Sequence, residues 1–403
     1  MNVSEQFGVL CLNSGSSSLK LALYTFHNGA PRKLFWGEAE EVGSKTGRVW
    51  SKGDSALSID EARSFADSAE AASYFIGRIQ EASLPEPRAV GHRIVHGGPS
   101  LREHRQITPE VMARLEEAVT FAPVHLPPSL EVLRRAMNLY PDIPHIACFD
   151  TAFHRTIPEC AAHLPFDHEF WALGLRRYGF HGLSCESIVR VLGNDLAPRS
   201  VVAHLGNGCS ITAIRNGASL ETTMGLTPTG GVMMGTRSGD LDPGVLLTLL
   251  RKGYRPEQLD SLLNHQSGLL GVSEESSDMR RLLESRDRDV KARLAIAMFC
   301  YQIRKSIGAM AAVLDGIDML VFTGGIGEHA PAIRADICAG LRHLGIILDD
   351  VANQQSGKRI SAAAAKCDVR VIAADEDREI AMHSYTLASD SGPGKGTKSA
   401  PLL

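Results

Sequence analysis

The sequence predicts an α/β protein of two domains with largely parallel sheets. Its 403 residues are more than one hydrophobic core normally serves, so we expect two cores. Strand-like runs alternate with helical ones after residue 88, which is the pattern of α/β architecture. Residues 10–24 and 201–217 each have the pattern of a strand, a glycine-rich polar turn and a second strand, which favours a duplicated domain.

The two polar turns have a common chemical character. NSGSSSLK and HLGNGCS are rich in glycine and small hydroxyl side chains, and such turns can surround an anion with backbone N–H groups. Two duplicated domains could bring both turns into one cleft. The alternative is two unrelated hairpins, because hairpins with Gly/Asn turns are common.

Helix and strand signals follow in the middle of the chain. A helix is expected to begin with the cap Thr108 and the first-turn Pro109, and to end before residue 123. A second helix is expected from Ser129. The apolar run 143–149 then predicts a strand that places Asp150 at the edge of a sheet, where α/β proteins bind their ligands.

The C-terminal part repeats the same pattern. Residues 291–315 predict a long helix that ends at Gly316, and the strand DMLVF runs directly into TGGIGEH. Asp375 and Glu376 end the next strand, before a further helix. We expect domains at residues 1–150, with 384–390 packed back on it, and at 151–383. The tail, residues 391–403, is rich in Gly, Ser and Pro and is expected to be disordered.

Composition and charge exclude several classes of partner. The formal net charge is −4 and no dense Lys/Arg block occurs, which argues against nucleic acid and membrane surfaces. No run reaches the roughly 18 apolar residues of a membrane span, and the N-terminus lacks a signal-peptide pattern. The eight cysteines contain no CxxC pair, so disulfides and zinc are not expected. These features predict a cytoplasmic protein with small polar ligands.

Short glycine-flanked strings carry the candidate chemistry, among them GHRIVHGG, YGFHG and MGTRSGDLDP. Two arginines (Arg93 and Arg237), His181, strand-end acids and two anion-binding turns suit phosphoryl transfer, where positioning and charge neutralisation dominate. A carboxylate acceptor is ionised at neutral pH and needs no general base. It needs cations, and the two arginines can bind two anions in bidentate fashion.

Other functions are possible from individual motifs. The chain has no GxxxxGK[ST] motif. GGIGEHA, with Asp349 further on, matches a dinucleotide fingerprint, so an NAD-linked oxidoreductase is an alternative. His92 and His96 lack the glutamate and third ligand of a metal site and are expected to be structural.

Taken in order, the strings NSGSSSLK, GHRIVHGG, APVHLPP, FDTAFH, YGFHG, HLGNGCS, MGTRSGDLDP and FTGGIGE resemble the acetate kinase family across almost the whole chain. The resemblance implies a duplicated RNase H-like fold of the actin, Hsp70 and sugar kinase type, with an active-site cleft between two domains. It also implies a homodimer that transfers phosphoryl groups reversibly between ATP and acetate, an EC 2.7.2.1 type of activity. A non-catalytic ATP-driven module of the actin or Hsp70 type is a further alternative, but such a module has no reason to carry Arg93, His181 and Arg237.

The resemblance also implies roles for individual residues. The catalytic set is Arg93, His125, Asp150, His181 and Arg237. Mg²⁺, or Mn²⁺, would bind Asn13, Asp150 and Glu376. ATP or ADP would contact the first turn (Asn13, Ser14, Gly15, Ser16, Ser18, Lys20), the second turn (His204, Gly206, Asn207, Gly208) and an adenosine site (Asp278, Met279, Arg280, Gly325, Ile326, Gly327, His329). The acceptor would lie against Arg93, Val95, Val124, Phe180 and Pro228.

Several positions depart from the family's usual pattern. They are Leu126, Leu183 and Cys185 near the histidines, and Met279 and His329 near the adenosine. Val124 stands where leucine is usual, which enlarges the acceptor pocket by about one methylene. Because one CH₂ discriminates only roughly 10-fold to 200-fold, propionate or butyrate is an alternative acceptor.

Overall fold

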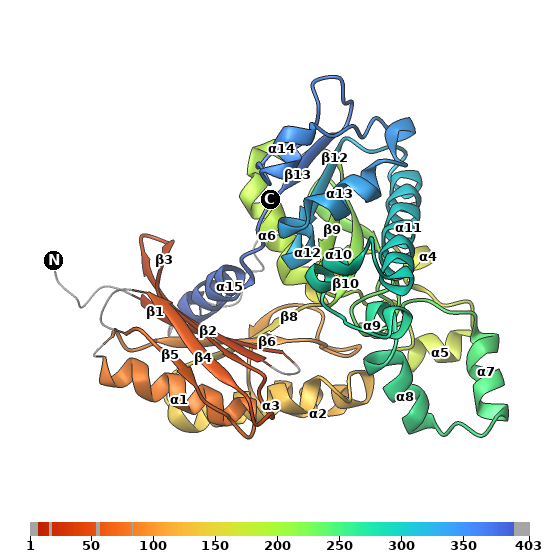
Figure 1. The fold of residues 1–403 in the computed structure, drawn as a ribbon. Helices are drawn as coiled ribbons and strands as arrows, with labels where there is room; N and C mark the ends of the chain where they lie inside the picture. The colour runs from red at the N-terminus through yellow and green to blue at the C-terminus, as the bar shows by residue number, and fades with distance from the viewer. Residues whose placement is uncertain (1–6, 16–17, 54–56, 83, 391–403) are drawn as a thin grey trace. The chain divides into compact units, whose positions relative to one another are not determined.

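The structure is a computed structural model that describes residues 7–15, 18–53, 57–82 and 84–390. It forms two compact units, residues 1–152 with 375–403 and residues 153–374 (Figure 1). The expected division continued the second domain to residue 383. The observed boundary comes earlier because helix α15 (Glu376–Asp390) packs along its length on strands of the first unit. The tail and Ser16 lie outside the described residues.

The first unit is built on a mixed sheet. Among the described residues its strand order is β5-β4-β3-β2-β1-β6-β8-β7. Strands β1, β6 and β8 are parallel, and β1, β2 and β3 form an antiparallel meander. The strands are β1 (Phe7–Ser14), β2 (Ser18–His27), β3 (Ala30–Glu40), β4 (Arg48–Gly53), β5 (Asp60–Ala62), β6 (Ala89–Ile94), β7 (Arg105–Gln106) and β8 (His145–Phe149).

Helices cover the two faces of this sheet. Leu10 and Leu12 of β1 contribute to the core under α1 (Ser68–Glu81) and α3 (Leu126–Leu139), while α15 packs on β1, β6 and β8. Gly91 of β6 allows a close approach of α15, since a Cβ there would lie 2.3 Å from Ser384 Oγ and 2.5 Å from Ile380 Cγ2. The remaining helices are α2 (Pro109–Glu117) and the 3₁₀ turn Ala118–Phe121.

The second unit repeats the sheet of the first. Its described strands are ordered β11-β10-β9-β12-β13, with β9, β12 and β13 parallel and β9, β10 and β11 antiparallel. This matches β3-β2-β1-β6-β8 in both order and direction, so the predicted duplication is confirmed. The strands are β9 (Arg199–Leu205), β10 (Cys209–Arg215), β11 (Ala218–Thr222), β12 (Met319–Thr323) and β13 (Asp368–Val371).

Two helices cover the second sheet. Ile188 and Leu192 of α6 form a core with Val202 and Val321, while α11 packs on β9, β10 and β11. The helices of this unit are α4 (Glu159–Ala162), α5 (His168–Ala172), α6 (Gly182–Leu192), α7 (Pro243–Arg251), α8 (Pro256–His265), α9 (Gly268–Ser273), α10 (Met279–Ser285), α11 (Val290–Val313), α12 (Gly324–His329), α13 (Pro331–Cys338) and α14 (Asp350–Gln354).

Local capping signals account for most helix boundaries. Thr108 caps α2 as predicted and accepts a hydrogen bond from the backbone N–H of Val111 at 3.2 Å. The prediction that the next helix begins at Ser129 is wrong, because α3 begins at Leu126 with prolines at 127 and 128 in its first turn. Prolines fit there since first-turn N–H groups have no intrahelical partner.

Two further observations concern the whole described chain. Within it, no helix is both long and apolar enough to cross a membrane. The eight cysteines all have free thiols, and only Cys160 among them is exposed. Burial raises the pKa of the Cys209 thiol to about 12, so this thiol is inert at neutral pH.

Candidate active site

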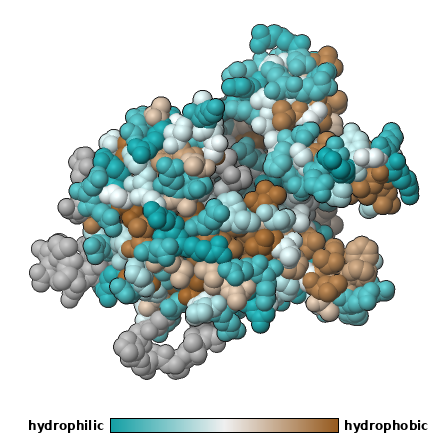
Figure 2. All heavy atoms as spheres, turned by 90° about the horizontal axis from the view of Figure 1, so that it is seen from below, coloured by the Kyte–Doolittle hydropathy of each residue, from teal (hydrophilic) through white to brown (hydrophobic). Residues whose placement is uncertain are grey.

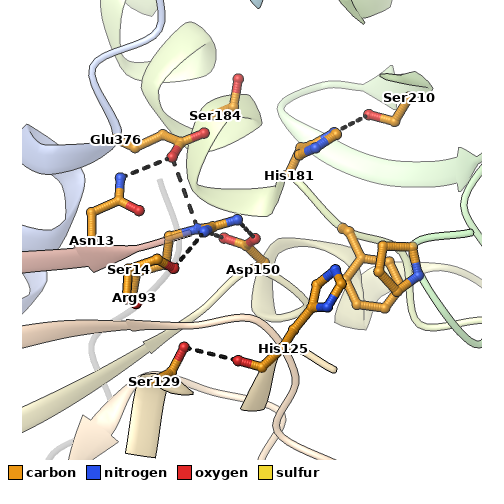
Figure 3. A network of polar contacts seen from close by, with 12 residues as sticks. Asn13, Ser14, Arg93, His125, Ser129, Asp150, His181, Ser184, Ser210 and Glu376 are labelled. Atoms are coloured by element: carbon orange, nitrogen blue, oxygen red, sulfur yellow. Dashed lines mark hydrogen bonds and ion pairs between the residues drawn. The ribbon is translucent and has the colours of Figure 1, made fainter. Parts of the chain in front are cut away.

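In the first unit, Arg93 and Asp150 form a buried ion pair at the carboxyl ends of parallel strands (Figure 3). Arg93 lies near the end of β6, and Asp150 directly follows β8. The guanidinium donates from Nε to Asp150 Oδ1 at 3.1 Å and from Nη2 to Oδ2 at 2.5 Å. Its Nη1 donates to the carbonyl of Ser14 at 3.3 Å. The pair therefore joins the ends of β1, β6 and β8.

The charge of Arg93 is secured by its neighbours. Burial alone would lower its pKa, but the carboxylates of Asp150 and Glu376 raise the pKa above its ordinary value. The Asp150 side chain is only 1% exposed and that of Arg93 is 16% exposed. Three of the five guanidinium N–H groups are used in these bonds. One N–H on each terminal nitrogen can therefore bind an anion.

A second polar group lies where α15 begins. Asn13 at the end of β1 donates from Nδ2 to Glu376 Oε2 and to Asp377 Oδ1, both at 3.3 Å. Glu376 Oε2 is also 3.9 Å from Arg93 Nε. Carboxylate and amide oxygens are the ligands that Mg²⁺ prefers, so Asn13 and Glu376 form an oxygen-rich site suited to this ion.

Asp377 and its partner Trp36 were not predicted from the sequence. Trp36 Nε1 on β3 donates to Asp377 Oδ2 at 2.9 Å. Burial raises the pKa of Asp377, while Lys33, Trp36 and Asn13 act to lower it. The neighbouring Asp375 caps α15 by accepting from the backbone N–H of residue 378 at 3.1 Å. The sequence signal was the acidic run DED, which does not show which of its members faces the interior.

The other predicted residues of this unit lie nearby on the same elements. Gly15 N donates to the Ser18 carbonyl at 2.8 Å and closes the first turn, and Lys20 pairs with Asn13 across β1 and β2. His125 is the cap residue of α3, and its carbonyl accepts a hydrogen bond from Ser129 Oγ at 3.1 Å. Val95, after β6, is buried, and Val124 precedes α3 in a half-buried position.

In the second unit, two histidines stack at the carboxyl end of β9. The ring centroids of His181 and His204 are 4.1 Å apart at an angle of 20°. His181 Nδ1 is hydrogen-bonded to Ser210 Oγ at 3.0 Å, and His204 Nδ1 to Ser184 Oγ at 2.8 Å. A hydrogen bond at Nδ1 therefore holds the orientation of each imidazole ring. Ser184 and Ser210 are supporting residues that the sequence analysis missed.

The turn between β9 and β10 passes close to these rings and to Arg237. A Cβ on Gly208 would lie 3.1 Å from His181 Nε2 and 3.5 Å from Arg237 Nη1. Only glycine leaves this point open. His181 itself has φ of +59°, an uncommon conformation for a residue with a side chain, and such strain is typical of functional sites. The geometry brings His181, Gly208 and Arg237 together.

The residues of this unit that were predicted to contact the acceptor and the nucleotide include several around the same turn. Pro228 is buried and its carbonyl accepts a hydrogen bond from Arg237 Nη1 at 3.2 Å. Phe180 is 1% exposed. Gly235 N donates to the Asn207 carbonyl at 3.3 Å, and a Cβ on Gly206 would lie 3.9 Å from the nitrogen of Gly325. Residues 206–208, 235 and 325 therefore form one glycine-rich surface.

The predicted adenosine residues differ in their exposure. Asp278 caps α10 and accepts from the backbone N–H of Arg280 at 2.9 Å. Met279 is buried at 3% exposure, whereas the side chains of Arg280 and His329 are 86% and 78% exposed. Gly325, Ile326 and Gly327 lie inside α12. Met279 is therefore packed inside the protein, while the side chains of Arg280 and His329 are exposed to solvent.

Comparison with known proteins identifies relatives of the whole chain. The sequence profile described as the acetokinase family matches residues 8–382. The chain is similar to the acetate kinase of Rhodopseudomonas palustris, with 44% identity over 94% of this chain and 98% of that protein. It is also similar to the acetate kinase of Cyanothece sp., with 41% identity over the same shares of the two chains.

Solved structures agree with these matches. The structure of a propionate kinase from Francisella tularensis superposes with a TM-score of 0.88 at 34% identity, over 94% of this chain and 100% of that one. The acetate kinase of Porphyromonas gingivalis gives a TM-score of 0.83 at 36% identity, over 94% and 99%. These matches do not support the oxidoreductase interpretation of GGIGEHA.

Proposed function

Since this chain belongs to the acetokinase family, we propose that its reaction is the reversible transfer of a phosphoryl group between ATP and acetate. The products in the forward direction are acetyl phosphate and ADP. The observation that carries the proposal is the pairing of Arg93 with Asp150. Both oxygens of Asp150 accept hydrogen bonds from the guanidinium, so this carboxylate is poorly placed to remove a proton from a hydroxyl. An acceptor that is already an anion needs no such base.

Arg93 binds the acceptor carboxylate in this proposal. Its Nη1 and Nη2 each retain one N–H group, and two parallel N–H donors match the two oxygens of a carboxylate. Asp150 keeps the guanidinium in one orientation. We assign Asp150 to holding Arg93 rather than to direct contact with the metal ion, because both of its oxygens are engaged.

His181 and Arg237 bind the phosphoryl group as it is transferred. Both place a nitrogen within 3.5 Å of the open point above Gly208, and donors fixed in advance at a site of developing charge lower the barrier without reorganisation. The bond between His181 Nδ1 and Ser210 Oγ holds the ring in one orientation, with Nε2 beside Gly208. His125 lines the acceptor side in this assignment.

Asn13 and Glu376 would hold Mg²⁺ through Asn13 Oδ1 and the Glu376 carboxylate. The ion neutralises charge on the β- and γ-phosphates of ATP when it is bound. The glycine-rich surface of residues 206–208 and 325 leaves room for the phosphates to approach the backbone, with Ile326, Gly327, Asp278, Arg280 and His329 around the adenosine. Gly15, Ser18 and Lys20 support the first phosphate turn.

The length of the acyl chain of the acceptor is a finer proposal. Val95, Phe180 and Pro228 are buried apolar residues, and Val124 stands where a larger leucine is usual. The propionate kinase of Francisella tularensis is a relative at 34% identity. We therefore propose that propionate is also accepted. The variant Val124→Leu tests this through kcat/KM for acetate and propionate, and an unchanged ratio would contradict it.

A homodimer is proposed from an apolar surface of the second unit. On α11, Val290, Leu294, Met298 and Tyr301 are 68%, 52%, 36% and 62% exposed, and their spacing places them along one stripe of the helix. α7 exposes further apolar residues, Val245, Leu247 and Leu250. Figure 2 shows brown, hydrophobic side chains towards the right-hand edge of the molecule, where α7 lies in Figure 1. Large exposed apolar patches mark interfaces.

Sedimentation at micromolar concentration tests the dimer. Leu294→Glu is expected to yield monomers because it buries an unpaired charge. Val351→Glu is a matched control, since Val351 is equally a surface residue, 68% exposed, on another helix. A wild-type protein that sediments as a monomer would contradict the proposal. With ATP as substrate and free thiols throughout, we further propose a cytoplasmic enzyme.

One assay tests the reaction itself. The protein is incubated with ATP, Mg²⁺ and acetate, propionate or butyrate, and the acyl phosphate is trapped with hydroxylamine. Arg237→Ala is expected to lose on the order of 10³ to 10⁵ in rate, the range for an arginine that stabilises the transition state. Arg342→Ala, at an exposed position, is the control. Wild-type turnover in Arg237→Ala would refute the assigned role.

A further inference from the structure

We propose that Asp377 is a positioning residue for the metal site, and that with Trp36 it fixes the amide of Asn13 so that Oδ1 is presented to the ion. The inference rests on the proposed function, which places Mg²⁺ at Asn13 and Glu376. It adds two residues, Asp377 and Trp36, that have no role in the assignment above. Their part is to orient a ligand, without contact to the ion.

The hydrogen-bonding capacity of the three groups allows one arrangement. An indole N–H can only donate, a carboxylate can only accept, and an amide can do either. Trp36 Nε1 donates to Asp377 Oδ2 at 2.9 Å, and Asp377 Oδ1 accepts from Asn13 Nδ2 at 3.3 Å. Since Asn13 also meets the carboxylate of Glu376 at 3.3 Å, its NH₂ end must face both acids. Figure 3 shows the nitrogen of Asn13 towards Glu376 and the oxygen turned away.

Burial explains why Asp377 acts on Asn13 and does not bind the ion itself. Asp377 is 7% exposed and Asn13 is 8% exposed. Each oxygen of Asp377 already accepts a hydrogen bond. Its backbone is fixed as well, because it lies in the first turn of α15, two residues after the capping residue Asp375. An acid in this position has little freedom except to hold the amide.

The geometry predicts what a neutral residue at position 377 would do. An asparagine there replaces one of the two acceptor oxygens by an NH₂ group, so either Trp36 or Asn13 would face a donor in place of an acceptor. Its NH₂ group would also stabilise the flipped amide of Asn13, which turns Nδ2 towards the ion. Loss of groups that orient metal ligands typically costs about 10-fold to 100-fold in metal affinity. We expect that loss for Asp377→Asn, with little change in the KM for the acceptor, since Asn13 does not bind the acceptor.

The experiment measures metal binding without turnover. Mn²⁺ is titrated into the full chain saturated with ADP, in the absence of acetate, and the free ion is followed by EPR, with a titration of ADP alone as reference. The variants are Asp377→Asn, Asp377→Glu and Trp36→Phe. Trp50→Phe is the matched control, because Trp50 Nε1 donates to a different carboxylate, Glu40 Oε1, at 3.0 Å and its ring contacts Trp36.

We expect the Mn²⁺ dissociation constant to rise about 10-fold to 100-fold in Asp377→Asn and less in Trp36→Phe. It should stay within a few-fold of wild type in Asp377→Glu, which keeps two acceptor oxygens, and in Trp50→Phe. Wild-type Mn²⁺ binding in Asp377→Asn would overturn the inference, and so would equal losses in Asp377→Asn and Asp377→Glu. If Asp377→Asn does not fold, the test is the comparison of the Mn²⁺ dissociation constants of Trp36→Phe and Trp50→Phe. Equal dissociation constants in these two variants would overturn the inference.

The Mn²⁺ titration contains no acceptor, so its result can be separated from a test of the proposed reaction. Failure of the wild type to form any acyl phosphate, together with weakened Mn²⁺ binding in Asp377→Asn, would refute the proposed reaction and leave the positioning role intact. Formation of acetyl phosphate by the wild type, together with unchanged Mn²⁺ binding in the variant, would do the reverse.

Discussion

Replacing Arg93 with methionine should destabilise the first unit strongly, and for a reason that can be separated from catalysis. The substitution keeps a long apolar side chain but removes the charge opposite Asp150. The Asp150 carboxylate is 1% exposed, and the lost guanidinium supplied it with two hydrogen bonds. A buried carboxylate without its cation must either stay charged in an apolar setting or bind a proton.

The magnitude follows from the geometry of the pair. At contact distances of 2.5 to 3.1 Å the attraction is several kcal/mol, and removing one partner of a buried pair typically costs about 3–5 kcal/mol. For a unit of this size, about 1 kcal/mol corresponds to roughly 2–4 °C in Tm. We therefore expect Tm of the first unit to fall by roughly 6–20 °C. The double variant Arg93→Met with Asp150→Asn should recover at least about 1 kcal/mol, since the buried carboxylate charge that lost its guanidinium is also removed.

Urea unfolding followed by tryptophan fluorescence measures this loss. Trp36 and Trp50 lie in the first unit and Trp171 in the second, so a Trp171→Phe background reports on the first unit alone. A loss of less than about 1 kcal/mol in Arg93→Met would refute the reasoning about the buried pair. If the double variant were as unstable as Arg93→Met, the loss could not come from the buried charge of Asp150.

Three further predictions test other parts of the structure. Gly208→Ala should lower kcat/KM for both acetate and ATP without changing Tm, because the added methyl group would lie 3.1 Å from His181 Nε2; normal kcat/KM values would contradict the assigned phosphoryl site. Burial lowers the pKa of His154 from 6.5 to about 4, so between these pH values the unfolded state binds a proton that the folded state does not. The free energy of unfolding should therefore be highest above pH 6.5 and should decrease by about 3 kcal/mol as the pH falls towards 4. His154→Gln should reduce this pH dependence of urea unfolding, while the exposed-site variant His343→Gln should retain it in full. Gly91→Ala should cost about 1–3 kcal/mol of stability through overpacking against α15, and wild-type unfolding would show that the helix can shift.

Local signals in the sequence predicted the secondary structure well where one residue type determines a boundary. The hydroxyl and proline at Thr108 and Pro109 define the start of α2 because the cap forms within three residues of sequence. The predicted start of α3 at Ser129 left the prolines at 127 and 128 outside the helix, although proline is compatible with a first helical turn. A pattern of two adjacent prolines does not show whether the backbone is already helical.

Long-range packing was beyond the sequence. The sequence predicted that residues 384–390 pack back on the first unit, but it did not show that residues 376–383 do so as well, since the deciding contacts are with Gly91 and β8. The same holds for Asp377. Its indole partner, Trp36, is 341 positions away in the chain, and the acidic run DED offers three carboxylates that look equivalent until the fold buries one of them.

The duplicated topology gives a physical reason for the proposed division of roles between the units. β1 and β9 occupy the same place in the two sheets, and each is followed by a glycine-containing turn. At the next strand the two copies differ. β6 leads to a charged side chain, Arg93, paired with the acid after β8, whereas β12 leads into the glycines of α12. Fixed charges suit a small anion and a metal ion, and bare backbone suits a nucleotide that must approach closely. If the proposed roles are correct, transplanting charge to the β12 edge, as in Gly325→Arg, should weaken ATP binding and leave the acceptor KM unchanged.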